Sequence, residues 1–360
     1  YENEILEAMQ KSYLSFEPDS LALGEIWSIA LKGRKSVFST KTGQLSVSEF
    51  DTDNEEKLPE LKSFTTINLP TNSLVRALAF DTISDRLACG TLDGNVILFE
   101  NIESAQPEPK IIYNHNNKRV LFLTFIPDKN WIISTSADTT IQIWDLAQQK
   151  TIRKLKTNDP VQKFVVVNSC QLIFTNSGGN VLRWNLNNIT SEPEIIYVNK
   201  TRQAFQTLAY NASHKWLAAA SSGTITIFHI DSDNTGNLKP EQFTLKHKGV
   251  ISHIEFSPDN NWLITASPDA LMLWNLREAG NMDISKFAPL VIENNRQIFS
   301  LAFLLNSKYF IYGDIMLLHI YPVDIEDIYS KLKLKTGKKE LNEQEWKYYV
   351  KGDLSKPVTK

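Results

Sequence analysis

The chain has 360 residues, of which 42% are hydrophobic and 22% are charged. This composition is typical of a globular protein that buries a large core and needs no disulfide or structural metal to fold. Its 38 basic and 41 acidic residues leave a formal net charge of -3, which excludes the broad positive field of non-specific nucleic-acid binders.

The chain contains two cysteines, Cys89 and Cys170, which lie far apart and within apolar runs. We expect both to be unpaired thiols that pack as small hydrophobic groups. No Cys/His spacing typical of a metal site occurs, so we expect neither a metal nor a cofactor.

The most apolar long stretch, residues 298–323, is interrupted by Lys308, Asp314 and His319. It falls short of the uninterrupted apolar length that a membrane-spanning helix requires. We therefore expect no membrane contact and a cytoplasmic protein. Because the chain begins with Tyr1 rather than methionine, we also expect it to be fused to an upstream domain.

Residues 1–14 have the pattern of an amphipathic helix. Ile5, Met9 and Tyr13 follow one another at intervals of four, the spacing that places side chains on one helix face.

From residue 26 onward one apolar pattern recurs: an apolar residue, two others, a second apolar residue, one more, and a third apolar or aromatic residue. Successive copies are about 45 residues apart, close to the period of about 40–45 residues for a four-stranded propeller blade. Seven copies occur: Ile26, Ile29, Leu31; Val75, Leu78, Phe80; Val120, Leu123, Phe125; Val161, Phe164, Val166; Phe205, Leu208, Tyr210; Ile251, Ile254, Phe256; and Ile298, Leu301, Phe303.

Each copy is followed by a turn, an apolar segment, a second tight turn and another short segment. In the third copy the segments are Trp131 to Ser136 and Ile141 to Trp144, and in the sixth they are Trp262 to Ile264 and Leu271 to Trp274. Short apolar or alternating runs between turn residues predict antiparallel strands rather than helices.

These residues resemble WD40-repeat β-propellers. The resemblance lies in the strand endings Trp144-Asp145, Trp184-Asn185 and Trp274-Asn275, with a turn at Asp93-Gly94 and His247 four residues before Ile251. It implies an all-β, seven-bladed propeller over residues 21–323.

WD40 blades commonly hold a hydrogen-bonded set of His, Ser, a turn Asp and the strand-end Trp. In this chain only the third copy combines an aligned turn Asp138 with a Trp144-Asp145 ending. We therefore expect most blades to be held by packing. In five copies the aligned His position is occupied by Thr71, Asn116, Thr157, Thr201 and Asn294.

The resemblance also implies a partner-binding mouth on the top face, at the residues flanking the first apolar residue of each copy. These include Leu74, Leu121, Pro160, Ala204, Val250 and Ser252. Our candidates for partner binding are Glu25, Trp27, Arg76, Arg119, Gln162, Gln206, Gln297 and Phe299. Aromatic and arginine side chains are enriched at binding hot spots, although Trp27 and Phe299 would also suit a purely structural cap on the channel.

The flanking segments are predicted to complete and decorate the propeller. Residues 1–20 are expected to supply the helix and, near Tyr13 to Pro18, a strand that closes the last blade, since an open edge would invite aggregation. Residues 324–360 are expected to form a helical tail. It would begin with an apolar stripe at Ile325 and Ile328, pack beside the N-terminal helix on the lower face, and not bind nucleic acid.

The segment Leu341 to Tyr349 resembles the stretch after WD40 arrays in bacterial multidomain signalling proteins, often with a STAND-type NTPase upstream. No catalytic motif occurs, and we expect structural or solvated histidines and no catalytic residues. The sequence thus predicts a non-catalytic recognition, sensor or docking module that binds a protein or peptide in bacterial signalling or defence. The alternatives are a free-standing scaffold and, less favoured, a propeller hydrolase.

Overall fold

The computed structural model describes residues 25–51, 59–62, 64–102, 104, 107–167, 169–199, 203–230, 238, 240–277, 289–293, 296–304, 307–315 and 317–323. These residues form strands and one short 3-10 helix, η2 (Pro127–Lys129). The predicted N-terminal helix and closing strand, and the predicted C-terminal tail, lie outside the described residues.

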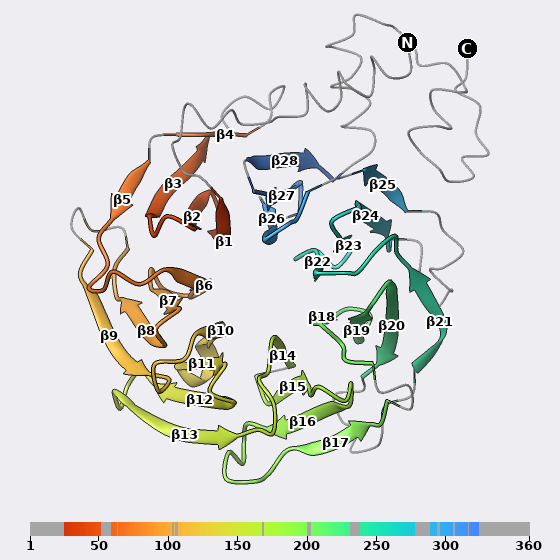
Figure 1. Cartoon of the computed structure of the whole chain (residues 1–360), viewed down its shortest axis with the longest axis horizontal. Helices are drawn as coiled ribbons and strands as arrows, with labels where there is room; N and C mark the ends of the chain where they lie inside the picture. The colour runs from red at the N-terminus through yellow and green to blue at the C-terminus, as the bar shows by residue number, and fades with distance from the viewer. Residues whose placement is uncertain are drawn as a thin grey trace, which may run out of the picture.

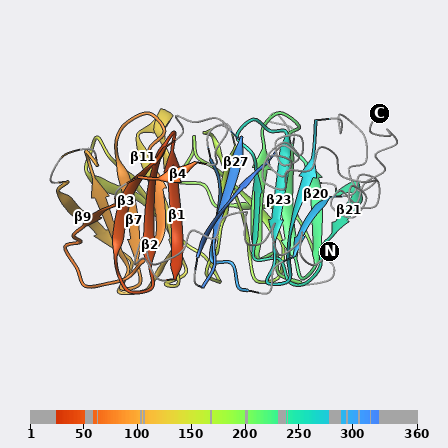
Figure 2. The same ribbon diagram turned by 90° about the horizontal axis from the view of Figure 1, so that it is seen from above.

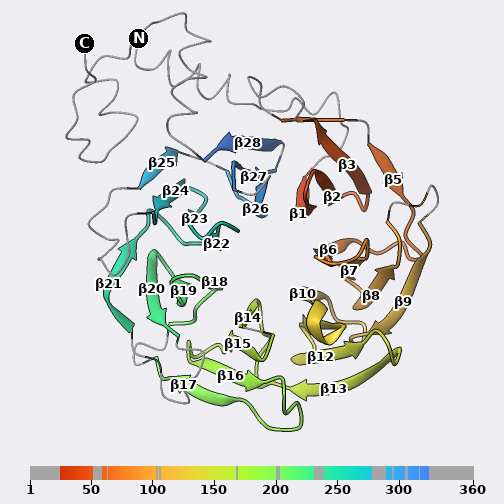
Figure 3. The same ribbon diagram turned by 180° about the vertical axis from the view of Figure 1, so that it is seen from behind.

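The strands form seven antiparallel sheets arranged as blades around a central axis (Figures 1 and 3). Seen from the side, strands such as β1, β7 and β23 run between the two faces of the ring (Figure 2). This is the all-β, seven-bladed propeller that the repeat predicts.

The first blade holds β1 (Ile26–Lys32), β2 (Lys35–Thr40), β3 (Leu45–Asp51), β4 (Glu60–Leu61) and β5 (Thr65–Ile67), with β4 and β5 both paired to β3. The second holds β6 (Val75–Phe80), β7 (Leu87–Thr91), β8 (Asn95–Phe99) and β9 (Pro109–Asn114). The third holds β10 (Val120–Ile126), β11 (Trp131–Ser136), β12 (Thr140–Asp145) and β13 (Lys150–Lys156). The fourth holds β14 (Phe164–Val167), β15 (Gln171–Thr175), β16 (Val181–Asn185) and β17 (Glu194–Tyr197).

The fifth blade holds β18 (Thr207–Asn211), β19 (Trp216–Ser221), β20 (Thr224–His229) and β21 (Pro240–Lys246). The sixth holds β22 (His253–Phe256), β23 (Trp262–Ala266), β24 (Ala270–Asn275) and β25 (Leu290–Glu293). The seventh holds β26 (Ser300–Leu304), β27 (Tyr309–Gly313) and β28 (Leu318–Pro322). Within the described residues this last sheet has three strands, and the predicted closing strand stays a prediction.

The second strand of each blade shows why the sequence forms buried sheets rather than half-exposed ones. Every residue of β19 is buried, as is every residue of β7 and β27. Each sheet has a neighbouring blade against both of its faces, so both sets of alternating side chains are removed from water. These segments therefore appear in the sequence as short continuous apolar runs.

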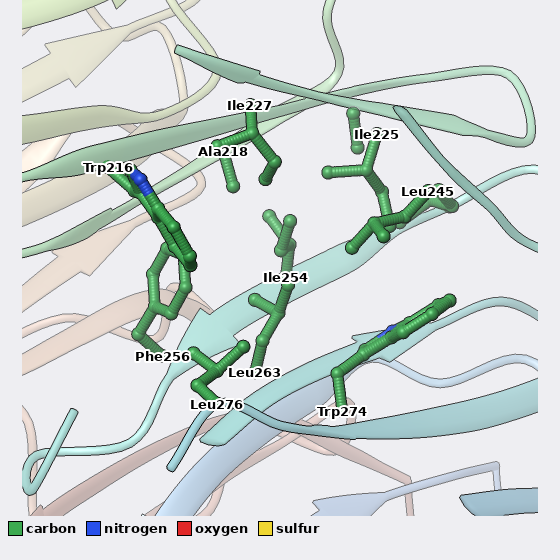
Figure 4. Packing of buried hydrophobic residues seen from close by; sticks show 13 residues of the cluster. Trp216, Ala218, Ile225, Ile227, Leu245, Ile254, Phe256, Leu263, Trp274 and Leu276 are labelled. Carbon is green, nitrogen blue, oxygen red and sulfur yellow. The ribbon is translucent and has the colours of Figure 1, made fainter. Parts of the chain in front are cut away.

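Hydrophobic clusters lie between neighbouring blades. Between the fifth and sixth blades, Trp216 and Ile227 pack against Ile254, Phe256 and neighbours from both sheets (Figure 4). The ring closes in the same way, because a cluster containing Ile26 and Phe38 of the first blade includes Ile311 of the seventh. Packing between blades holds the inner strands around the axis, and those strands carry the candidate site.

Candidate functional site

The seven inner strands, β1, β6, β10, β14, β18, β22 and β26, position the mouth. The first apolar residue of each copy is buried: Ile26, Val75, Val120, Val161, Phe205, Ile251 and Ile298. We use "top face" for the end of the ring at which these strands begin. The candidate residues beside the buried positions retain exposure: Arg76, Arg119, Gln162, Gln206 and Gln297 are exposed, and Glu25, Trp27 and Phe299 are partly exposed.

Trp27 and Arg76 are in direct contact at the mouth. The Arg76 Cζ atom lies 5.7 Å from the centroid of the Trp27 ring, within cation–π range. Its Nη1 atom donates a long hydrogen bond of 3.5 Å to the Trp27 carbonyl oxygen. Although Arg76 is exposed at the mouth, partial loss of water around its guanidinium lowers the pKa of Arg76, and the like charge of Arg119 lowers it further. The two cations therefore lie close enough to repel each other.

The other candidates have different surroundings. Glu25 is paired with Lys41, with 3.0 Å between Oε2 and Nζ. The Phe299 carbonyl oxygen lies 3.1 Å from Nε2 of His253. The side chains of Gln162, Gln206 and Gln297 make no hydrogen bond to any described residue. Of the eight candidates, the pair for which the structure shows a direct contact is Trp27 and Arg76.

Three titratable side chains lie below the mouth and were not among our candidates: Lys163, His253 and Glu255, which we call the axial cluster. Ile254 and Phe256 belong to the core between the fifth and sixth blades. Because side chains alternate along a strand, His253 and Glu255 lie on the opposite face of β22, toward the seventh blade. The charge of Lys163 acts on both side chains and that of Arg76 acts on His253, from blades across the ring.

Lys163 links three blades across this region. It precedes β14 in the fourth blade, and its Nζ lies 5.8 Å from the Phe122 ring centroid in the third. The same ammonium donates a hydrogen bond of 3.5 Å to the Ile254 carbonyl oxygen in the sixth. Burial lowers the pKa of Lys163, whereas Glu255 raises it in part.

Burial also shifts the two other members of the axial cluster toward their neutral forms. It lowers the pKa of His253 to about 4, helped by the positive charges of Lys163 and Arg76. It raises the pKa of Glu255 to about 7, against the pull of Lys163. In a neutral ring, Nε2 of His253 donates to the Phe299 carbonyl, and Nδ1, 3.0 Å from the Ser252 hydroxyl, accepts.

The described residues of this arrangement show neither a base coupled to a nucleophile nor a metal cluster. The three axial side chains make no hydrogen bond to one another, so no base is coupled to a nucleophile. The described residues contain no group of three His, Cys, Asp or Glu able to hold a metal ion. Cys89 and Cys170 are both free thiols, as predicted.

The third blade contains a buried polar network centred on His115. Nε2 of His115 lies 2.8 Å from the Ser134 hydroxyl, and Nδ1 lies 3.0 Å from the Thr140 hydroxyl and 3.4 Å from Oδ1 of Asp138. Burial would raise the pKa of Asp138, but hydrogen bonds from Thr140 and the charge of His115 hold it below its usual value.

The prediction that Asn116 occupies the histidine position of this blade is therefore wrong, because His115 fills it. Asn116 and Asn117 adopt positive φ values of 49° and 55° and lengthen the connection before Val120, whose strand then bulges between Val120 and Phe122. His115 lies five residues before Val120, whereas His247 lies four residues before Ile251. A fixed spacing of four residues therefore points to Asn116 instead of His115.

The sixth blade has a smaller version of this network. The Trp274 indole donates to the Thr265 hydroxyl over 3.3 Å, and Nε2 of His247 lies 3.3 Å from the Thr265 carbonyl oxygen. Among the described residues, sets that join a histidine before the inner strand to the second strand thus occur in the third blade and, in part, in the sixth. The second blade has a polar set of another composition, in which hydrogen bonds join Thr91, Asp93, Asn95 and Asn114. That packing holds most blades stays a prediction.

The comparisons with known proteins identify the same two blades. The WD40 family profile (WD domain, G-beta repeat) matches residues 107–145 and 239–275. These stretches contain the strands that carry the His115 network and the His247–Trp274 set. Among the described residues, no helix has the length and apolar character needed to cross a bilayer.

Curated relatives match over about half of the chain or slightly more. The protein LST8 homolog of Drosophila melanogaster is 27% identical over 223 residues, which are 60% of this chain and 69% of that protein. The target of rapamycin complex subunit LST8 of Saccharomyces cerevisiae is 26% identical over 186 residues, 51% of this chain and 60% of its own length. Both relatives are eukaryotic and give no support to the predicted bacterial setting.

A solved structure supports the fold over most of the ring. The crystal structure of the WD40 beta propeller domain of Doa1 aligns with a TM-score of 0.64 and 16% identity, covering 84% of this chain and 94% of that one. Together with the seven sheets and the two matched repeats, this alignment identifies the chain as a seven-bladed β-propeller of the WD40 type.

Proposed function

We propose that this chain is a non-catalytic protein-interaction scaffold that holds a partner at its top-face mouth. The observation that carries the proposal is the contact of exposed Arg76 with the partly exposed Trp27 ring, beside Arg119. Tryptophan and arginine are the residue types most enriched among those that dominate binding energy. The described residues offer binding chemistry at this end of the ring and no coupled catalytic set.

The names of the relatives are consistent with this proposal. Relatives from Saccharomyces cerevisiae and Bos taurus are named target of rapamycin complex subunits, and a subunit of a complex needs a surface that holds other proteins. By analogy, we infer a role in assembling a complex and not in transforming a substrate.

The test removes the central contact without disturbing the packed core. The chain and its Trp27→Ala/Arg76→Ala double variant are immobilised, and proteins captured by the first and lost from the second are purified and their affinities measured. We expect the double variant to lose capture, because hot-spot truncations cost about 2 kcal/mol or more each. Thermal unfolding establishes that both proteins fold equally.

Lys308→Ala provides a matched control, because Lys308 is exposed in the turn between β26 and β27, at the opposite end of the ring. Capture should be unchanged in this variant. If the double variant captures the same proteins as the unaltered chain, the partner site lies elsewhere, and the segments around residues 51–60 and 231–241 become the next candidates.

The wider setting of the module stays a prediction. A reading frame that encodes an NTPase or another effector domain upstream of Tyr1 would support a sensor within a larger signalling protein. A frame that encodes this chain alone would favour the free-standing scaffold. The genome that contains the gene tests the predicted bacterial source. Localisation of the tagged protein in cells tests the predicted cytoplasmic location.

A further inference from the structure

The mouth has a local charge imbalance that the net charge of the whole chain conceals. Arg76 and Arg119 form no ion pair with any described residue, and neither does Lys163 of the axial cluster. The candidate acid at the mouth, Glu25, is already paired with Lys41. Arg76 and Arg119 therefore lie side by side at the mouth without a counter-ion among the described residues, whereas Lys163 has the charge of Glu255 near it.

Two acidic groups in the neighbouring top-face turns, Asp138 and Asp314, have partners within their own blades. Asp138 accepts from the Thr140 backbone and hydroxyl. Asp314 lies 3.3 Å from Nη1 of Arg296 and 3.0 Å from Nε2 of His319. These carboxylates are held by local partners, so they leave the mouth cations available.

The electrostatic repulsion between Arg76 and Arg119 would be reduced by a negatively charged ligand bound between them. The Arg76 guanidinium is held over the Trp27 ring and feels the like charge of Arg119. Two neighbouring cations without a counter-ion disfavour each other, whereas a carboxylate between them gains charge-assisted hydrogen bonds from both. Guanidinium groups suit this contact because their planar donors can bind a carboxylate through two parallel hydrogen bonds.

The axial cluster does not cancel this positive charge. His253 is neutral around pH 7, since burial holds its pKa near 4. In the sixth copy the position equivalent to Arg76 is Ser252, and Glu255 comes three residues after it. Burial raises the pKa of Glu255 to about 7. The excess at the mouth is therefore positive, with an aromatic ring beside it.

We propose that the mouth binds an acidic segment of the protein partner, with its carboxylates held between Arg76 and Arg119 and its chain lying against Trp27. This inference rests on the proposed function and adds the chemistry of the partner. The observations favour an acidic peptide over nucleic acid, because the chain has a net charge of -3 and the site offers two neighbouring arginines rather than an extended basic stripe.

The experiment uses defined probes: fluorescein-labelled octaglutamate, octalysine and a neutral glycine-serine peptide of equal length. Fluorescence anisotropy measures the binding of each to the full chain. We expect octaglutamate alone to bind, with an affinity that falls as salt rises from about 50 to 500 mM, because the charges lie at a solvent-exposed opening. Binding of octalysine or equal binding of all three peptides would overturn the inference.

Reversing the charges of Arg76 and Arg119 tests whether these two residues bind the acidic peptide. In the Arg76→Glu/Arg119→Glu variant the affinity for octaglutamate should fall about tenfold or more, whereas Lys308→Glu, a single charge reversal at the lower face, should leave it unchanged. Arg76→Gln/Arg119→Gln gives a milder neutralisation should the reversal impair folding. Unaltered binding in all of these variants would also overturn the inference.

Two further arms separate the alternatives. A labelled oligothymidylate of eight nucleotides that binds more tightly than octaglutamate would assign the site to phosphate chemistry instead. If octaglutamate fails to bind while Trp27→Ala/Arg76→Ala still abolishes partner capture, the acidic-segment inference fails and the proposed function stands. If capture survives that substitution, the proposed function fails independently.

Discussion

The third and fifth blades reach the same four-stranded geometry by different means. In the third, His115 is buried among Ser134, Thr140 and Asp138, so polar groups inside the blade satisfy one another. In the fifth, β19 is entirely buried and includes three successive alanines, Ala218, Ala219 and Ala220. Small side chains there allow the neighbouring sheets to approach, and packing replaces the network.

This difference explains which blade a sequence comparison recognises. The WD40 family profile covers the network strands of the third blade within residues 107–145, whereas the fifth blade lies outside both matched stretches except for β21. A hydrogen-bonded set needs particular residue types at fixed positions, but a packed interface accepts many apolar combinations of similar volume. Blade geometry can therefore persist after its sequence signature is lost.

Phe228→Ala should produce the largest effect, because the fifth blade depends on packing. The Phe228 side chain is fully buried, and its ring centroid lies 4.8 Å from that of Tyr197 and 6.1 Å from that of Phe205. Truncation should lower the free energy of unfolding by about 3–5 kcal/mol, as measured by urea denaturation. Phe228→Leu should cost much less, and a loss below about 1 kcal/mol in the alanine variant would contradict a packing-based blade.

The sequence was sufficient for the fold because the apolar triplet recurs seven times and each copy spans or just precedes the start of an inner strand. It was insufficient for the exact position of His115, because positive φ values at Asn116 and Asn117 add a residue without changing the apolar pattern.

The mouth positions could be listed from the repeat, but the Trp27–Arg76 contact depends on side-chain conformation. The axial cluster had a usable signal that was overlooked. Between the second and third apolar residues of each copy, Glu255 stands where the first and fifth copies have Ala30 and Ala209. The reach of Lys163 to the Ile254 carbonyl depends on the diameter of the ring, which residue spacing does not encode.

His115→Ala should have the second-largest effect and tests the polar half of the comparison. It removes a fully buried ring and leaves the Ser134 and Thr140 hydroxyls without that partner. Each hydrogen bond lost in a buried network costs about 0.5–1.5 kcal/mol, and two are lost here, so urea denaturation should show a loss of about 1–3 kcal/mol. A double-mutant cycle with Ser134→Ala should give a coupling of at least about 0.5 kcal/mol, and strictly additive losses would argue against a network.

Tyr113→Phe should have a smaller effect and tests whether the Tyr113 hydroxyl belongs to the same network. The Tyr113 and Ser134 hydroxyl oxygens lie 2.6 Å apart, and the Tyr113 ring stacks on Trp144 at 5.5 Å. Phenylalanine keeps the stacking and loses only the hydrogen bond, so we expect a loss of about 0.5–1.5 kcal/mol in urea denaturation. In a Ser134→Ala background the loss should nearly vanish, and an undiminished loss would place the contribution of Tyr113 elsewhere.

Glu255→Ala should have the smallest effect and extends the comparison to the axis, because it gives the sixth blade the residue that the fifth has in Ala209. Burial raises the folded-state pKa of Glu255 from its usual value of 4.5 to about 7. Between these values the folded chain binds more protons than the unfolded chain, so Glu255 makes stability fall as pH rises. The alanine variant should lack this fall.

Stability measured by urea denaturation at pH 5 and at pH 8 tests this sign. Relative to the unaltered chain, Glu255→Ala should be more stable at pH 8 than at pH 5, by about 1 kcal/mol or less because Glu255 is partly exposed. His253 has the opposite slope, since its lowered pKa makes stability rise between about pH 4 and 6.5, but it is common to both proteins and cancels in the difference. Glu255→Gln keeps the side-chain volume and should show the same change with pH, so a difference that is independent of pH in both variants would mean that Glu255 is solvated as fully as an ordinary surface carboxylate.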